Sequence, residues 1–99
     1  MDSGELLKLL LESVEAGKVN KEATFPPALR GFDGADELTQ QALALGIKPA
    51  DILEKALIKA MENVGRKFSE KKIFVPQMLV SAKAMNAALI HLKPFFCIG

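Results

Sequence analysis

Two side chains that are often reactive stand alone in this sequence. His91 is the only histidine and Cys97 the only cysteine. One histidine and one cysteine cannot build a zinc site, and a single cysteine cannot form an internal disulfide. We find no glycine-rich phosphate loop, no nucleophile elbow and no HExxH motif. The sequence therefore predicts no catalytic residues, no metal ligands and no enzyme.

A different kind of chemistry is indicated by the stretch GRKFSEKKIFVPQMLV, residues 65–80. Its apolar side chains flank a run of charged residues: Phe68, Phe74, Val75 and Met78. One interpretation is a hydrophobic staple, in which a residue before a helix packs against its first turn. The other is an exposed apolar surface that covers a flat ligand or a partner. The residues alone leave both open.

The bulk composition argues against several classes of partner. The 99 residues carry a formal net charge of +1 and contain no Trp or Tyr. Neither the charge nor the aromatic content indicates binding to nucleic acid or to a membrane surface. The N-terminus is acidic where a signal peptide would be basic, and no apolar run approaches a membrane span. We expect one cytoplasmic domain.

The elements that must position these side chains are helical, because apolar residues recur at helical spacing and nowhere alternate as in a strand. The predicted helices cover residues 5–16, 33–45, 49–68 and 76–94. Gly17 and Gly46 suit left-handed helix ends, and Pro49 and Pro76 suit the first position of a helix. Pro94 is expected to end the last helix. We predict an all-α fold, a four-helix bundle made of two helix hairpins.

Residues 18–32 form the exception, since they contain Pro26, Pro27 and Gly31 and read as an irregular connection. We expect its apolar side chains to pin it to the core: Phe25, Leu29 and Phe32. In the last helix we expect one apolar stripe to face the bundle: Val75, Met78, Leu79, Ala82, Met85, Asn86 and Leu89. Gly65, near the end of the third helix, indicates either a close backbone approach or fraying.

The segment from Leu45 to Pro94 resembles the N-terminal helical cap module of corrinoid proteins, which serve cobalamin-dependent methyltransferases. The cap domain of cobalamin-dependent methionine synthase is similar. The shared signature pairs a Met-x-x-Val-Gly-x-x-Phe segment with a Phe-x-Pro segment and a following Ser-Ala-x-x-Met. It appears here as Met61, Val64, Gly65, Phe68, Phe74, Pro76, Ser81, Ala82 and Met85, while Ala60 stands where the family commonly has Gly.

The resemblance implies a non-catalytic cap of a corrinoid methyl carrier. The cap would span residues 1–94, with 95–99 as a short tail. It would cover the upper face of cobalamin and shield the cobalt-bound methyl group during methyl transfer. By position, the cofactor-binding residues are Phe68, Phe74, Val75 and Met78.

The family's cobalamin-binding Rossmann-like domain normally follows the cap and carries Asp-x-His-x-x-Gly, whose histidine is the lower ligand of cobalt. This motif is absent here, and His91 lacks its context. We therefore expect a chain truncated before that domain, with little or no stable cobalamin binding by itself. The implied partners are a Rossmann-like cobalamin domain and a cognate methyltransferase.

The alternative is a stand-alone helical module that no longer binds cobalamin. Such a module would use the same apolar surface for protein interaction or for homodimer formation.

Overall fold

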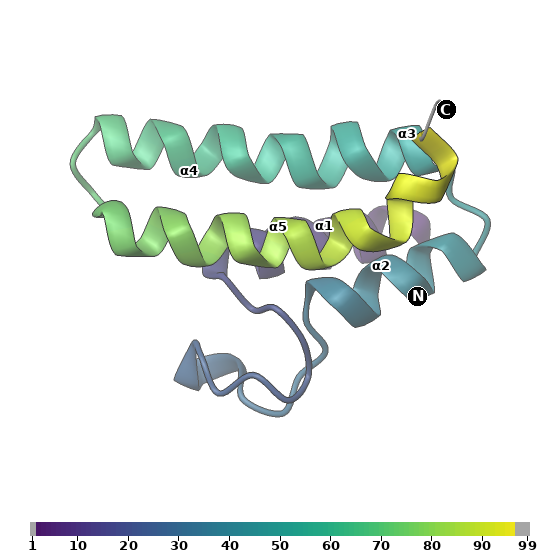
Figure 1. Cartoon of the computed structure of the whole chain (residues 1–99), viewed down its shortest axis with the longest axis horizontal. Coiled ribbons are helices and arrows are strands. Elements are labelled where there is room, and N and C mark those ends of the chain that lie inside the picture. The colour runs from purple at the N-terminus through teal and green to yellow at the C-terminus, as the bar shows by residue number, and fades with distance from the viewer. Residues whose placement is uncertain (1, 97–99) are drawn as a thin grey trace.

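A computed structural model describes residues 2–96, which form an all-α bundle without strands. Helix α1 (Ser3–Ala16) is followed by a long connection that contains one short 3-10 turn, η1 (Pro27–Leu29), and leads to α2 (Ala35–Ala44). The long hairpin of α4 (Lys59–Ser69) and α5 (Val75–Phe96) lies on one side, with α1 and α2 behind and below it in Figure 1. The predicted fold class is confirmed.

The third predicted helix is continuous over residues 49–69 but not uniform. It begins as α3 (Pro49–Ile52), passes through a π-helical segment (Leu53–Ile58) and continues as α4 (Lys59–Ser69). Pro49 occupies the start of α3 as predicted. The buried face of this helix is rich in alanine, which lets neighbouring helices approach closely: Ile52, Ala56, Leu57, Ala60 and Val64.

Two predicted glycine stops are confirmed by their backbone. Gly17 has φ +80° and Gly46 has φ +92°. After α2, the Gly46 N–H donates to the Leu43 carbonyl and the Ile47 N–H to the Ala42 carbonyl, which is a Schellman motif. The helix starts differ slightly from expectation, since Asp2 caps α1 and Gly34 precedes α2.

The predicted end of the last helix is wrong. α5 continues through Pro94 to Phe96. Proline removes one backbone donor and crowds the preceding turn, but its fixed φ is compatible with helix. The last turn accordingly leaves the line of α5 in Figure 1 instead of stopping at the proline. Cys97 and the rest of the predicted tail lie outside the described residues.

The predicted inner stripe of α5 is also wrong. The residues that α5 buries completely are mostly small: Ser81, Ala84, Ala88 and Leu92. Small side chains allow α5 to lie close to α1, α2 and α4, all of which it contacts. Part of the expected stripe is turned outward as a result, since Val75 and Leu79 are 52% and 65% exposed, while Met85 and Leu89 still pack against the core as partly buried side chains. No described helix is long and apolar enough to cross a membrane.

Candidate functional site

The four predicted site residues meet at one end of the α4–α5 hairpin. Phe68 lies in the last turn of α4, Phe74 directly precedes α5, and Val75 and Met78 lie in its first turn. This is the left end of the hairpin in Figure 1. Phe68, Phe74 and Val75 are 41%, 75% and 52% exposed, and Met78 is half-buried. We call these four residues the hairpin-tip surface.

The turn that joins the two helices is closed by backbone hydrogen bonds. The Lys71 N–H donates to the Phe68 carbonyl at 3.0 Å and the Lys72 N–H to the Lys67 carbonyl at 2.8 Å. Lys71 takes a left-handed conformation with φ +62°, which glycine adopts more readily. The turn therefore reverses the chain within a few residues and brings Phe74 back toward Phe68.

Glu15, at the end of α1, fixes the position of this hairpin end. Its carboxylate accepts hydrogen bonds from Asn63 Nδ2 and Lys67 Nζ, both at 3.1 Å. Its backbone carbonyl accepts from Gln77 Nε2 at 3.0 Å and from Ser81 Oγ at 2.9 Å. One residue of α1 thus ties both helices of the hairpin, and the end of α1 gains donors for a carbonyl that helix geometry leaves free.

Phe25 borders the hairpin-tip surface, which the sequence did not reveal. Phe25 comes from the long connection and lines a hollow of about 450 Å³ with Phe74, Pro76 and Val80. The expectation that Phe25 and Phe32 pin the connection to the core is wrong, because they are 45% and 63% exposed. The sequence does show an apolar side chain, Phe25, next to two prolines in this connection. This pattern does not indicate which surface of the bundle the connection crosses.

Gly65 also adjoins this region. It lies one turn before Phe68 on α4, and a Cβ atom placed there would meet no heavy atom within 4 Å. Of the two alternatives that the sequence left open for Gly65, a close backbone approach does not occur within the described chain. Because glycine has no side chain, the surface of α4 beside Phe68 is not covered at this position.

His91 lies far along α5 from the hairpin tip. Its Nε2 pairs with the Asp36 carboxylate of α2, which the sequence could not reveal because the two are distant in the chain. Within residues 2–96 no group of three or more His, Cys, Asp or Glu side chains could hold a metal ion. The tip surface therefore offers apolar contact area, and the described residues contain no such metal-binding group beside it.

A family model described as "B12 binding domain" matches residues 32–93 of this chain. The match includes α2, the continuous helix over 49–69 and nearly all of α5. All four residues of the hairpin-tip surface lie within it.

Curated relatives of the chain include corrinoid proteins of Methanosarcina species. Monomethylamine corrinoid protein 2 of Methanosarcina acetivorans is 48% identical over 61 residues, which are 62% of this chain and 28% of the relative. Trimethylamine corrinoid protein of Methanosarcina barkeri is 39% identical over 80 residues, which are 76% of this chain and 37% of the relative. The chain thus spans about a third of the length of these relatives. No solved structure matches the chain significantly.

Proposed function

The chain belongs to the B12 binding domain family, and on this premise we propose that it is the non-catalytic cap of a corrinoid methyl carrier, covering the upper face of cobalamin. Cobalamin is the cofactor that the family and the corrinoid relatives indicate. When bound, it supplies a cobalt centre that carries a methyl group. The residues of this chain bind and orient the cobalamin ring and exclude water from its upper face.

The observation that carries the proposal is the hairpin-tip surface itself. Phe74 is 75% exposed at the end of a hairpin whose position is fixed by Glu15. Exposed apolar side chains on a rigid support lose little conformational entropy when a flat ring is placed against them. The open surface beside Gly65 leaves room for such a ring next to Phe68.

Excluding water is the role these side chains suit. The side chains of Phe68, Phe74 and Val75 carry no hydrogen-bond donor or acceptor, and the Met78 thioether is only a weak acceptor. An apolar cover keeps solvent from a reactive group until the cover moves away. The cover would therefore act by protection, with a partner enzyme performing the transfer.

The lower face of cobalamin must be held by another domain under this proposal. The one histidine of the chain, His91, is paired with Asp36 and is therefore not offered as the lower ligand of cobalt. We propose a Rossmann-like cobalamin domain as this partner, together with a cognate methyltransferase, and we expect the chain alone to bind cobalamin weakly.

A chimera tests the cap role. The segment of Trimethylamine corrinoid protein of Methanosarcina barkeri that matches this chain is replaced by this chain, and the product is loaded with methylcobalamin. We expect slower photolysis of the methyl–cobalt bond than for free methylcobalamin. Phe74→Ala with Met78→Ala is expected to remove most of this protection, because an upper face that is no longer closed lets the photolysis fragments separate.

The matched control is Phe95→Ala, since Phe95 is 60% exposed at the other end of α5. It removes the same ring from a surface outside the proposed site. Equal photolysis rates for the tip variant, the control and the unmodified chimera would refute the cap role.

The exposed apolar tip also suits a second function, a homodimer or protein-interaction module without cobalamin. Sedimentation of the isolated chain separates the two. A dimer that Phe74→Ala dissociates, together with unprotected methylcobalamin in the chimera, would favour the interaction module.

A further inference from the structure

Gly65 lies inside α4 although nothing in the described chain requires a glycine there. The fold does require glycine at other positions. Gly17 and Gly46 have positive φ. A Cβ atom at Gly34 would lie 2.6 Å from the backbone nitrogen of Asn20. At Gly65 the backbone is helical and a Cβ atom would meet no heavy atom within 4 Å, so an alanine would fit without strain.

The end of α4 does not explain this glycine either. The helix continues beyond Gly65 to Ser69, and the Glu70 N–H closes its last turn by donating to the Arg66 carbonyl at 2.9 Å. Inside a helix, glycine in place of alanine lowers the folding equilibrium constant about fivefold, because glycine has more backbone freedom to lose. Gly65 therefore destabilises α4, and no contact within residues 2–96 offsets this effect.

Gly65 lies next to the hairpin-tip surface. Residues three or four apart are neighbours on the surface of a helix, so Gly65 adjoins Phe68 on one side and Met61 on the other. Phe68 is 41% exposed, and Met61 is partly buried. The backbone of α4 is thus left uncovered between two apolar side chains. We call this opening at the Cβ position of residue 65 the Gly65 notch.

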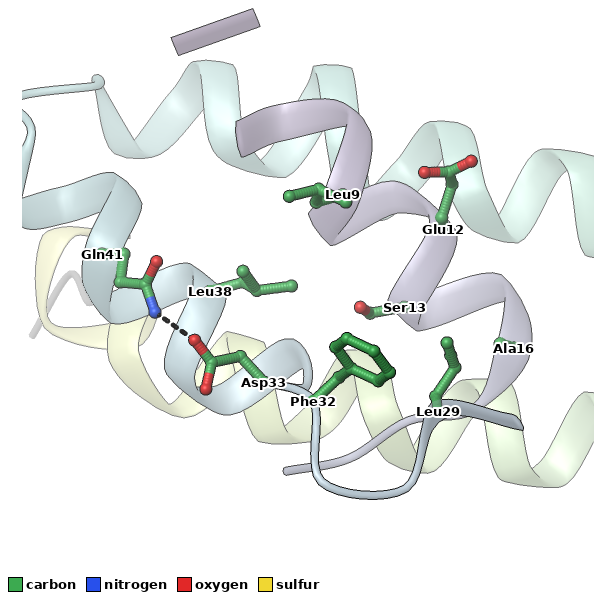
Figure 2. A pocket seen from close by; sticks show the side chains of 9 residues that line it. All are labelled: Leu9, Glu12, Ser13, Ala16, Leu29, Phe32, Asp33, Leu38 and Gln41. Carbon is green, nitrogen blue, oxygen red and sulfur yellow. Dashed lines mark hydrogen bonds between the residues drawn. The ribbon is translucent and has the colours of Figure 1, made fainter. Parts of the chain in front are cut away.

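The Gly65 notch differs from a hollow that remains where several segments meet. Figure 2 shows such a hollow, of about 580 Å³, between α1, the long connection and α2. Its apolar lining comes from all three segments and includes Leu9, Phe32 and Leu38, so the hollow is space that these segments leave between them. The Gly65 notch lies on a single helix and follows only from the absence of a side chain. The reason for a glycine there is therefore to be sought outside the chain.

We propose that the corrin ring of cobalamin lies directly against the backbone of α4 at Gly65, so that the Gly65 notch is part of the cofactor-binding surface. This inference rests on the proposed cap function, and it extends the surface from the hairpin tip along α4 toward Met61. Glycine lets a ligand approach the backbone more closely than any other residue does. A side chain at position 65 would hold the ring away from Phe68, and the cover would no longer close on the ring.

Two variants of the isolated chain test whether the fold needs this glycine. Gly65→Ala is expected to raise the urea midpoint of unfolding by roughly 0.3–1 M, since alanine is the better helix former. Gly65→Leu, whose helix propensity is close to that of alanine, should also unfold at or above the midpoint of the parent. A lower midpoint for Gly65→Ala would mean that the fold itself requires the glycine, and the proposal would be overturned.

The same two variants are then made in the chimera loaded with methylcobalamin. We expect Gly65→Leu to lose most of the protection against photolysis, as the Phe74→Ala, Met78→Ala variant does, and Gly65→Ala to lose a smaller part. A chain that is more stable and yet protects less separates contact with the ring from damage to the fold. The matched control is Gly4→Leu, which adds the same side chain at an exposed position near the start of α1 and should leave photolysis unchanged.

The outcomes separate this inference from the cap role. If the parent chimera protects methylcobalamin and Gly65→Leu protects it equally well, the ring does not lie on the Gly65 notch, and the cap role stands without it. If the parent chimera gives no protection, the cap role and the Gly65 contact both fail. An equal loss of protection in Gly4→Leu would contradict a contact that is specific to Gly65.

Discussion

At the scale of single residues, a buried lysine supports the start of the long connection. Lys18 is fully buried, and its ammonium donates to the backbone carbonyls of Lys21 and Ala23. A buried charge needs such partners, because water is no longer available to solvate it. Lys18 therefore holds the first part of the long connection in place, although a lysine after a helix-ending glycine looks like a solvent-facing residue.

Thr39 presents the opposite case. It is fully buried in α2, and its Oγ1 has no hydrogen-bond partner. We predict that Thr39→Val raises the free energy of unfolding by about 1 kcal/mol, because it keeps the shape and removes an unsatisfied hydroxyl. Urea denaturation measures the change. Thr24→Val, at an exposed position, is the control and should stay within about 0.5 kcal/mol of the parent. A loss of stability in Thr39→Val would mean that the hydroxyl is satisfied.

At the scale of elements, α5 shows why an apolar pattern did not fix a helix face. Apolar residues occur on more than one side of α5, so periodicity offered several candidate stripes. Packing chose the side with Ser81, Ala84 and Ala88, since only small residues let three neighbouring helices come close. Apart from the buried Leu92, the larger apolar residues of α5 were left half-buried or exposed, and Val75 and Met78 supply part of the hairpin-tip surface.

The turn between α4 and α5 carries a strained residue. Lys71 has φ +62°, a conformation that costs an L-residue about 1–2 kcal/mol and glycine almost nothing. We predict that Lys71→Gly stabilises the chain by about 0.5–1 kcal/mol after the greater freedom of unfolded glycine is deducted. Thermal unfolding should show a midpoint higher by several degrees.

The neighbouring Lys72→Gly provides the comparison, because Lys72 is exposed and is not in the positive-φ region. It should be neutral or destabilising. The strain argument fails if the two glycine variants change the midpoint equally.

At the scale of the whole molecule, the end of α1 is the junction that orients the hairpin. Besides the bonds to Glu15, the backbone at Gly17 packs directly on Val80 of α5. A Cβ atom at position 17 would lie 2.3 Å from Val80 Cγ1, which is far inside contact distance. The tip surface keeps its position relative to the bundle because α1 and α5 touch at this point.

We predict that Gly17→Ala lowers the free energy of unfolding by about 2–4 kcal/mol, through left-handed strain together with overpacking. Gly31→Ala isolates the strain, because Gly31 has φ +86° but no heavy atom near its Cβ position. It should lose only about 1–2 kcal/mol. Chemical denaturation of both variants, and of Gly17→Ala combined with Val80→Ala, measures the difference. Equal losses at the two glycines would contradict a close α1–α5 contact.

The sequence by itself determined the helical class, the glycine and proline boundaries and the placement of Phe68, Phe74, Val75 and Met78 around one turn. These features depend on spacing within a few residues, and short-range spacing can be read directly. The resemblance added a family that the comparisons support.

Only the tertiary structure decided which face α5 buries, that Glu15 anchors the hairpin, that Phe25 joins Phe74 and that Asp36 meets His91. The physical reason is that these contacts join residues far apart in the chain. Glu15 and Ser81, for example, are separated by 66 positions. Such pairs form only after the helices have packed, and packing depends on the sizes of all the side chains between them.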